Sequence, residues 1–557
     1  MRRRMGTPAA WLMVGLIPAL LVLALPQLHA APAAGGFAVA TENPLSTQAA
    51  VAQLRNGGNA VDAAVAAALV AGVVNGTSSG LGGGGFALYW AAPKGDGKSQ
   101  KPLIVDFRET APQAVDAAAF DKRPFAPEQR AKATGVPGEA LGLFELQRRF
   151  GQRDWASVVQ PAIDAATQGF VPSPHMVKSL TSQGESLRKD PKIAELFFPG
   201  GSQQAPAKLF NPGLGHVLQW LSQLGPNAIY DGPVAADIVA TAARGGGAVS
   251  YKDLQSYRTV DREPLHISWE GYEIYTMPAP SGGGVMLGQV LGMFSKAELQ
   301  KWGIDSGAYI HHVGEAIRTS FADRFRYLGD PAFEKMDIPG LLSPEKLKAR
   351  RAAIQEKQTR ALPQLLATEN GTHHMVFSDK EGNVVSLTTT VNNAFGAKLM
   401  TQSGILLNDQ LNDCSFKQDS LKFGSGVSPN RPRPGARPVS SMTPTLVLKD
   451  GKPVLAVGGS GGFRIGPNVT QTLLANLVFG LSPKAIVQRA RFAVPIMGPT
   501  LLVDEKAPKK LFADLKGRGE TVEPLKDDYS AVQLITFKNG RPSAASDPRK
   551  AGLAVAE

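Results

Sequence analysis

The chain of 557 residues contains one cysteine, Cys414. A single cysteine excludes an intrachain disulfide and any metal site that needs two thiolates. The zinc-binding pattern H-E-x-x-H is absent. His373 and His374 are adjacent, so on a strand their side chains would point to opposite faces and could not bind one ion together. We therefore expect no metal site.

Charged residues are also few, at 19% of the chain. Lys and Arg exceed Asp and Glu by 59 − 47 = 12, but no run of basic residues is interleaved with aromatics. This pattern predicts a diffusely basic surface and no nucleic-acid partner. The 60 glycines and 41 prolines follow no period, which excludes a collagen-like chain. The length and a hydrophobic content of 43% are typical of a globular enzyme with two lobes or one large α/β unit.

Long apolar runs are scarce. The run from Trp11 to Leu25 has only 15 residues, which is short for a membrane span. Three arginines precede it at 2–4, and small residues follow it at 28–31. This order is typical of a cleaved secretory signal, with an uncleaved anchor as the alternative. We expect a signal peptide over residues 1–30 and a periplasmic or secreted protein.

The glycine run at 80–85 matches the letters of the dinucleotide fingerprint G-x-G-x-x-G. That fingerprint must follow a strand and open a helix. Here the run follows a predicted helix at 60–71, capped by Asn59, and opens a predicted strand at 86–90. The pattern G-x-x-x-x-G-K-[ST] of a phosphate loop is absent as well. We therefore expect a tight, closely packed turn and no cofactor.

Helical and Gly/Pro-rich stretches give way to β-rich sequence at Gly371, after a predicted helix and exposed linker over 341–370. Residues 375–377 and 384–391 are typical of strands, and the turn-like segment 379–383 lies between them. In a hairpin centred near residue 381, the numbers of facing residues sum to about 762. This register predicts Thr372 opposite Thr390, with Thr390 and Asn392 on one face.

Gly371-Thr372 marks a possible reactive centre at the start of this hairpin. A threonine hydroxyl is a weak nucleophile that needs a base. An N-terminal threonine carries its own base, because the α-amine has a pKa near 8. Such an amine arises only if the bond before Thr372 is cut, and a glycine at 371 would let the hydroxyl approach the carbonyl. On composition alone, an ordinary strand threonine remains the alternative.

Several motifs follow one another along nearly the whole chain after the signal, at 43–48, 57–64, 78–86, 106–112, 327–331, 372–374, 379–383, 390–392, 403–413, 437–445 and 459–464. Together they resemble the motifs of γ-glutamyltransferases. This family belongs to the N-terminal nucleophile hydrolases.

The resemblance implies a four-layer αββα sandwich cut into two intertwined subunits that form one domain. Residues 31–371 would be the large subunit, and 372–557 would be the small catalytic subunit. The implied activities are γ-glutamyl transfer and glutathione hydrolysis. Donors such as glutathione would pass their γ-glutamyl group to water, an amino acid or a dipeptide.

The resemblance also implies the reacting groups. Thr372 would be the nucleophile both for cutting the Gly371–Thr372 bond and for γ-glutamyl transfer, and Thr390 would hydrogen-bond it. The backbone amides of Gly461 and Gly462 would form the oxyanion hole, since fixed amides stabilise a tetrahedral oxyanion.

For the donor's α-carbon, the resemblance implies a second set of residues. Arg108 would bind the α-carboxylate, helped by Ser440 and Ser441, because a guanidinium can bind a carboxylate with two hydrogen bonds. The α-ammonium would be held by Asn392, Gln410 and Asp413.

Some positions depart from the family pattern. They are His373, Asn412 and the segment 74–77, and none has an implied role. Residues 416–433 are long enough for a loop over the site but match no lid sequence of the family. Two alternatives remain: a glutaryl or cephalosporin acylase of the same fold, and an unprocessed homologue without activity.

Overall fold

The structure is a computed structural model, and it describes residues 36–93, 101–121, 124–360, 371–423, 427–496, 499–526 and 529–557. The predicted signal peptide and residues 361–370 of the predicted linker lie outside these ranges. None of the helices in the described ranges combines the length and the apolar character needed to cross a membrane.

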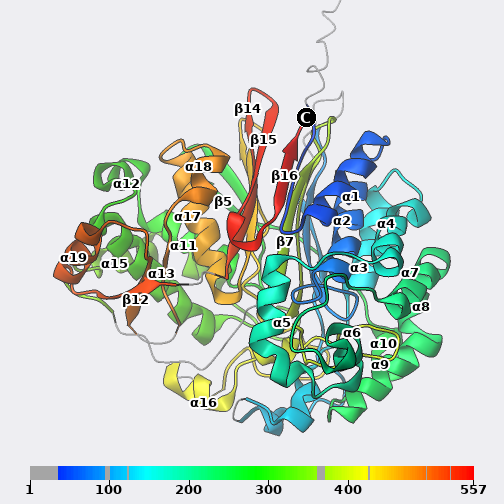
Figure 1. The fold of residues 1–557 in the computed structure, drawn as a ribbon. Coiled ribbons are helices and arrows are strands. Elements are labelled where there is room, and N and C mark those ends of the chain that lie inside the picture. Colours follow the sequence, from blue (N-terminus) through cyan, green and yellow to red (C-terminus); the bar gives the residue numbers. More distant parts are fainter. Residues whose placement is uncertain are drawn as a thin grey trace, which may run out of the picture. The chain divides into compact units, whose positions relative to one another are not determined.

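Two antiparallel sheets form the centre of the fold (Figure 1). The seven-stranded sheet has the order β16 (Leu553–Ala556), β1 (Ala38–Thr41), β7 (Gly371–Ser378), β8 (Val384–Asn392), β2 (Gly84–Trp90), β3 (Leu103–Phe107) and β4 (Val260–Arg262). The six-stranded sheet has the order β15 (Arg541–Ser546), β14 (Ala531–Lys538), β10 (Lys452–Ser460), β9 (Thr445–Lys449), β6 (Tyr272–Thr276) and β5 (Leu265–Trp269). A third, small sheet holds β11 (Phe492–Ala493), β12 (Thr500–Asp504) and β13 (Thr521–Leu525).

The inner strands of the seven-stranded sheet are buried on both faces, whereas its edge strands β16 and β4 are partly exposed. Val39 of β1 and Ala87 of β2 belong to the hydrophobic core shared with the N-terminal helices. Their neighbours Ala40 and Phe86 belong to the core shared with the other sheet. Because side chains alternate along a strand, the apolar residues of each inner strand contribute to two cores.

Helices cover both outer faces of the paired sheets (Figure 1). One layer packs on the seven-stranded sheet and contains α1 (Pro44–Arg55), α2 (Ala60–Val74), α3 (Glu139–Phe150) and α4 (Trp155–Gln168). The opposite layer packs on the six-stranded sheet and contains α11 (Gly283–Met293), α13 (Gly307–Tyr327) and α17 (Ile465–Leu477). This arrangement confirms the expected four-layer αββα sandwich.

Further α-helices lie in the described ranges, and the predicted helix after residue 341 is confirmed as α15. They are α5 (Pro174–Leu187), α6 (Pro191–Phe197), α7 (Pro212–Leu224), α8 (Asn227–Tyr230), α9 (Gly232–Arg244), α10 (Tyr251–Ser256), α12 (Lys296–Trp302), α14 (Ile338–Leu341), α15 (Pro344–Ala352), α16 (Lys417–Ser420), α18 (Pro483–Gln488) and α19 (Lys509–Gly517).

The N-terminal end of α2 is fixed by a capping box. Asn59 Oδ1 accepts hydrogen bonds from the amides of Val61 and Asp62, and Asp62 Oδ2 accepts one from the Asn59 amide. The helix was predicted to end at residue 71 and continues to Val74. Nearly all its residues are buried, as its uniformly small and apolar sequence requires.

The β7–β8 hairpin confirms the predicted register over most of its length. The pairs from His373–Thr389 to Ser378–Val384 all sum to 762. The register shifts between Gly371 and His373, and Gly371 pairs with Asn392. Two residues of β8, Thr390 and Val391, therefore oppose the single residue Thr372. The prediction of a one-to-one Thr372–Thr390 pair is wrong because this β-bulge adds one residue to β8.

Candidate active site

The carbonyl oxygen of Gly371 accepts two hydroxyl hydrogen bonds at the start of β7. Thr372 Oγ1 donates to it at 2.6 Å, and Thr390 Oγ1 donates to it at 2.7 Å. Thr390 therefore contacts the carbonyl of Gly371, the residue before Thr372. The resemblance implied a hydrogen bond to Thr372 itself. The bulge accounts for this difference, because it leaves Thr390 beside the peptide bond. The Asn392 amide donates to Thr390 Oγ1 at 2.8 Å and fixes its orientation.

Gly371 has no room for a side chain. A Cβ at this position would lie 2.6 Å from the Asn392 carbonyl oxygen and 2.8 Å from the Asn393 carbonyl carbon. Both contacts are with backbone, which cannot move without distorting the hairpin. Glycine is therefore required by the close approach of the two strands.

A buried lysine that sequence reasoning missed links Thr372 to the neighbouring sheet. Lys550 Nζ donates to the Thr372 carbonyl oxygen at 2.9 Å and to Ser460 Oγ at 2.8 Å, and it lies 3.1 Å from Glu42 Oε2. Burial raises the pKa of Glu42, and the Lys550 ammonium opposes that shift. Glu42, which follows β1, also accepts a hydrogen bond from the His374 amide of β7 at 3.1 Å. The ion pair with Lys550 therefore holds β1 and β7 together around Thr372.

The predicted oxyanion glycines lie at a strand-to-helix turn. β10 ends at Ser460, and a 3₁₀ turn, Gly462–Arg464, leads into α17. Gly461 and Gly462 have φ angles of 109° and 59°, a region that favours glycine. The first amides of a helix lack intrahelical acceptors and bind anions readily. Lys550 donates hydrogen bonds both to Ser460, just before this turn, and to Thr372, so the turn lies beside the candidate nucleophile.

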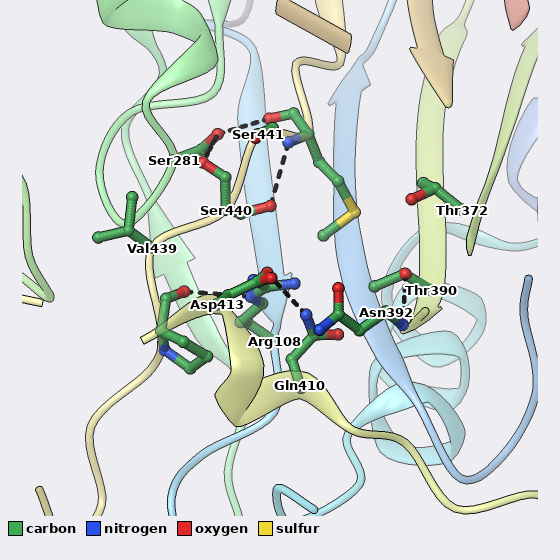
Figure 2. Close-up of polar contacts among 12 residues, drawn as sticks. Arg108, Ser281, Thr372, Thr390, Asn392, Gln410, Asp413, Val439, Ser440 and Ser441 are labelled. Atoms are coloured by element: carbon green, nitrogen blue, oxygen red, sulfur yellow. Dashed lines mark hydrogen bonds and ion pairs between the residues drawn. The ribbon is translucent and has the colours of Figure 1, made fainter. Parts of the chain in front are cut away.

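Arg108, Gln410 and Asp413 form a buried polar cluster (Figure 2). Arg108 Nη2 lies 2.5 Å from Asp413 Oδ2, and Gln410 Nε2 donates to the same oxygen at 2.8 Å. The side chains of Arg108 and Asp413 are only 1% and 4% exposed. Within the described ranges, Asp413 Oδ1 and Gln410 Oε1 have no hydrogen-bond donor although both are buried. Two free acceptors next to a guanidinium match a ligand that carries both an ammonium and a carboxylate.

The two predicted serines lie on a loop that other side chains hold in place. Ser281 Oγ donates to the Ser440 carbonyl oxygen at 3.2 Å. Arg324, on α13, donates to Ser441 Oγ and to the Val439 carbonyl oxygen. Arg324 is a second residue that sequence reasoning missed, because it lies 117 residues before the serine that it contacts.

Asn392 ends β8 with a left-handed backbone, φ 76°. Its Nδ2 donates to the Asp409 carbonyl oxygen at 3.0 Å, and in Figure 2 its side chain extends toward Gln410. The β-hairpin and the 3₁₀ turn Gln410–Asp413 therefore meet at this residue.

The two adjacent histidines point to opposite faces, as predicted. His373 Nδ1 lies 2.7 Å from Asn75 Nδ2, at the end of α2. His374 Nδ1 lies 2.8 Å from Thr388 Oγ1, and its ring packs against Gly458 of the other sheet. Burial lowers the pKa of both imidazoles, to about 3 for His374, so both are neutral at pH 7. Within the described ranges, no group of His, Cys, Asp and Glu side chains is arranged to hold a metal ion.

The family model described as gamma-glutamyltranspeptidase matches residues 46–557. The chain belongs to this family. Glutathione hydrolase proenzyme from Pseudomonas aeruginosa is 34% identical over 536 residues, which cover 93% of this chain and 94% of the relative. Glutathione hydrolase 2 from Arabidopsis thaliana is 32% identical over 554 residues, which cover 93% of each.

Solved structures show the same fold. A cephalosporin acylase from Bacillus halodurans matches with a TM-score of 0.83 at 24% identity, over 96% of this chain and 99% of that one. A gamma-glutamyltranspeptidase from Pseudomonas nitroreducens, complexed with L-DON, matches with a TM-score of 0.51 at 32% identity, over 56% of this chain and 92% of that one. The chain thus has the fold of the N-terminal nucleophile hydrolases.

In this gamma-glutamyltranspeptidase family member, the predicted site residues fall into connected groups. Thr372 and Thr390 meet at the Gly371 carbonyl, and Lys550 connects Thr372 to the turn at 461–462. Arg108 reaches the serine loop through Pro438, whose carbonyl oxygen accepts from its Nε at 3.2 Å. The predicted loop at 416–433 contains α16 and a 3₁₀ turn, while residues 424–426 lie outside the described ranges.

Proposed function

We propose that this chain is a γ-glutamyltransferase and glutathione hydrolase whose nucleophile, Thr372, is released by self-cleavage. The observation that carries this assignment is the buried cluster around Arg108. It presents a guanidinium together with two acceptors that have no donor among the residues that the structure describes, Asp413 Oδ1 and Gln410 Oε1. The α-carbon of a γ-glutamyl group carries the matching carboxylate and ammonium.

Self-cleavage follows from the contacts at Gly371. The Thr372 hydroxyl attacks the Gly371 carbonyl carbon, the C–N bond breaks, and the acyl group moves from nitrogen to oxygen. Water then hydrolyses the ester, which leaves a carboxylate on Gly371 and a free amine and hydroxyl on Thr372. The Thr390 hydrogen bond to the carbonyl oxygen stabilises the negative charge that develops during attack.

The two subunits, 31–371 and 372–557, would stay together after the cut. The second contains 557 − 371 = 186 residues. Its strands β7 and β8 lie between β1 and β2 of the first subunit in one sheet. The ladder hydrogen bonds on both sides of this pair hold the cleaved chains together.

In the transfer reaction, the Thr372 α-amine accepts the proton of its own hydroxyl, which attacks the donor's γ-carbonyl carbon. Backbone amides of Gly461 and Gly462 stabilise the oxyanion. The leaving amine takes the proton, and a γ-glutamyl ester remains on Thr372. Water or the amine of an acceptor then attacks this ester and regenerates the free threonine.

Donor binding replaces the Arg108–Asp413 pair with a four-charge network. The donor α-carboxylate binds Arg108, with Ser440 and Ser441 nearby, and the α-ammonium binds Asp413, with Gln410 and Asn392. Each buried charge then keeps an opposite partner, which avoids the cost of an unpaired buried ion. A glutaryl group lacks the ammonium and leaves Asp413 Oδ1 without a donor, so the acylase alternative fits this site less well.

The test compares γ-glutamyl-p-nitroanilide with glutaryl-p-nitroanilide, which differ only in the ammonium. We expect kcat/KM for the glutamyl compound to be higher by a factor on the order of 10⁴, since sites built around a polar group reject analogues that lack it. Asp413→Asn should narrow this ratio, and Arg108→Ala should weaken both reactions. Equal rates for the two compounds would favour the acylase and overturn the role of Asp413.

We further propose export through the signal peptide at 1–30, into the periplasm or medium. The basic residues, the short apolar run and the small residues after it support this. The N-terminal sequence of the larger subunit from exported protein tests the proposal. A start near residue 31 is expected, and a start at residue 1 would contradict it.

A further inference from the structure

A cavity of about 730 Å³ lies beside the donor site, and the proposed function leaves it unassigned. One wall is formed by Asn393, Asp409 and Asn412. The other wall comes from the 3₁₀ turn Pro127–Ala133 and from the C-terminal half of α5.

This cavity adjoins the peptide bond that is to be cut. The Gly371 backbone packs directly against Asn393, as the forbidden Cβ position showed. The carboxylate of Asp409 accepts hydrogen bonds from the Asn393 amide at 3.0 Å and from Asn393 Nδ2 at 2.8 Å. Asn392 donates to the Asp409 backbone. The cavity wall and the donor site therefore share one hydrogen-bonded loop.

Two cations, Arg130 and Lys398, line the cavity. Arg130 donates to the carbonyl oxygens of Pro127, at 2.7 Å, and Lys398, at 3.4 Å. Lys398 Nζ donates to Ser186 Oγ at 3.3 Å. All these acceptors are neutral. In the described part of the chain, neither cation forms an ion pair with a carboxylate.

The electrostatics of the two cations favour an anion. Both are partly buried, and burial lowers the pKa of Arg130 and of Lys398. The neighbouring Arg130 lowers the pKa of Lys398 further, whereas the Asp409 carboxylate opposes that shift, as Asp190 and Glu128 do for Arg130. Lys398 also has a left-handed backbone, φ 54°, which costs free energy in a residue other than glycine. An anion between the two cations would offset both the burial and the mutual repulsion.

Asp409 also lies in the wall, and hydrogen bonds from two residues of the same wall hold its carboxylate. Its oxygens accept from Asn393 and from Asn412 Nδ2, at 2.9 Å for the latter. Burial raises the pKa of the Asp409 carboxyl. The cavity thus combines amide and carboxylate acceptors next to Gly371 with two cations, Arg130 and Lys398. A peptide with an amine at one end and a carboxylate at the other matches this polarity.

We propose that Arg130 and Lys398 bind the C-terminal carboxylate of the peptide that leaves Thr372 or attacks its ester. This inference rests on the proposed function and names the substrate class, γ-glutamyl peptides and acceptor peptides with a free C-terminal carboxylate. In glutathione, that group is the glycine carboxylate.

The experiment compares glutathione with its glycine monoethyl ester, which has the same γ-glutamyl group but no charge at the far end. We expect Lys398→Gln and Arg130→Gln to lower kcat/KM for glutathione on the order of tenfold each, through KM, as for a lost charge-assisted hydrogen bond. Hydrolysis of the ester should change little. Lys189→Gln, which removes an exposed lysine after α5, is the control and should leave both rates unchanged.

A second arm separates leaving groups from acceptors. With γ-glutamyl-p-nitroanilide as donor, glycylglycine and glycylglycine amide compete as acceptors, and only the use of glycylglycine should fall in the variants. An effect with glutathione alone assigns the carboxylate to the leaving group, and an effect with glycylglycine alone assigns it to the acceptor. If the variants keep the wild-type preference for glutathione over its ester and for glycylglycine over its amide, the subsite is wrong. If wild-type protein fails to cleave γ-glutamyl-p-nitroanilide, the proposed function itself is wrong.

Discussion

At the scale of single residues, the contacts of the Gly371 carbonyl bear on both proposed reactions, self-cleavage and γ-glutamyl transfer. Its oxygen accepts from both threonine hydroxyls, and the one from Thr390 needs no movement to stabilise a developing oxyanion. After the proposed cleavage, we expect the same hydroxyl to lie beside the new Thr372 amine. One side chain is thus positioned to act in both reactions, which makes Thr390 a residue on which the two rates should depend together.

Thr390→Val keeps the shape and the β propensity of the side chain but removes its hydrogen bond. We expect slower maturation and slower turnover, each by a factor on the order of ten to a thousand, the range for a positioned group. Gel-monitored cleavage and p-nitroaniline release measure the two rates. Thr521→Val, on the exposed strand β13, is the control. Wild-type rates for Thr390→Val would refute its role.

Glu139 predicts a pH dependence of stability. It is fully buried at the start of α3, and burial raises its pKa from 4.5 to about 8. The folded protein therefore keeps this carboxyl protonated where the unfolded chain releases the proton. The contribution of Glu139 to the free energy of unfolding is fully present below pH 4.5 and is lost as the pH rises to about 8.

Glu139→Gln removes this titration and keeps the shape of the side chain. Between pH 4.5 and 8, the free energy of unfolding of this variant should rise relative to that of wild type, by at most about 1.4 kcal/mol per pH unit. The difference in melting temperature between the two proteins should rise with it. Calorimetry across this range measures the effect, with the exposed Glu185→Gln as control. An offset that does not change with pH would contradict the raised pKa.

At the scale of elements, the sequence could predict structure wherever the signal is local. The cap at Asn59, the end of α1 at Arg55 and most of the hairpin register follow from neighbouring residues. The bulge opposite Thr372 does not, because it depends on the left-handed backbone at Asn392 and on packing against β2. The one-to-one pairing with Thr390 failed for that reason.

Lys550 shows the same limit for the site. It lies 178 residues from Thr372 in sequence, and composition gives no reason to separate it from the other 58 basic residues. Only the adjacency of β1, β7 and β10 brings Glu42, Thr372 and Ser460 to its ammonium. The resemblance to a family supplied most other residues of the site, since their roles rest on matching motifs and not on periodicity.

The Lys550–Glu42 pair should align β7 for cleavage. Lys550→Met alone would leave Glu42 as an unpaired buried charge and destabilise the fold, so the matched variant is Lys550→Met with Glu42→Gln. We expect this double variant to fold but to cleave itself more slowly, by a factor on the order of ten or more, because Thr372 loses an anchor. Gel densitometry over time measures this, with Lys538→Met as control. Wild-type cleavage kinetics would reduce the pair to a structural role.

At the scale of the whole molecule, the order of strands in the seven-stranded sheet would keep the active site assembled after the proposed cut. Strands β7 and β8, which follow the proposed break, lie between β1 and β2 of the other proposed subunit, so the proposed cleavage would free an amine without separating the chains. The four layers then enclose Thr372 between the two sheets, with the donor cluster at the end of β3 and the glycine turn at the end of β10.

The most direct test of this account is a denaturing gel of purified protein, with N-terminal sequencing of the smaller band. We predict two bands for the wild type and a smaller band that begins Thr372-His373-His374, while Thr372→Ala remains a single chain. Two bands from Thr372→Ala, purified without proteases, or a smaller band that begins at another residue, would contradict self-cleavage by Thr372.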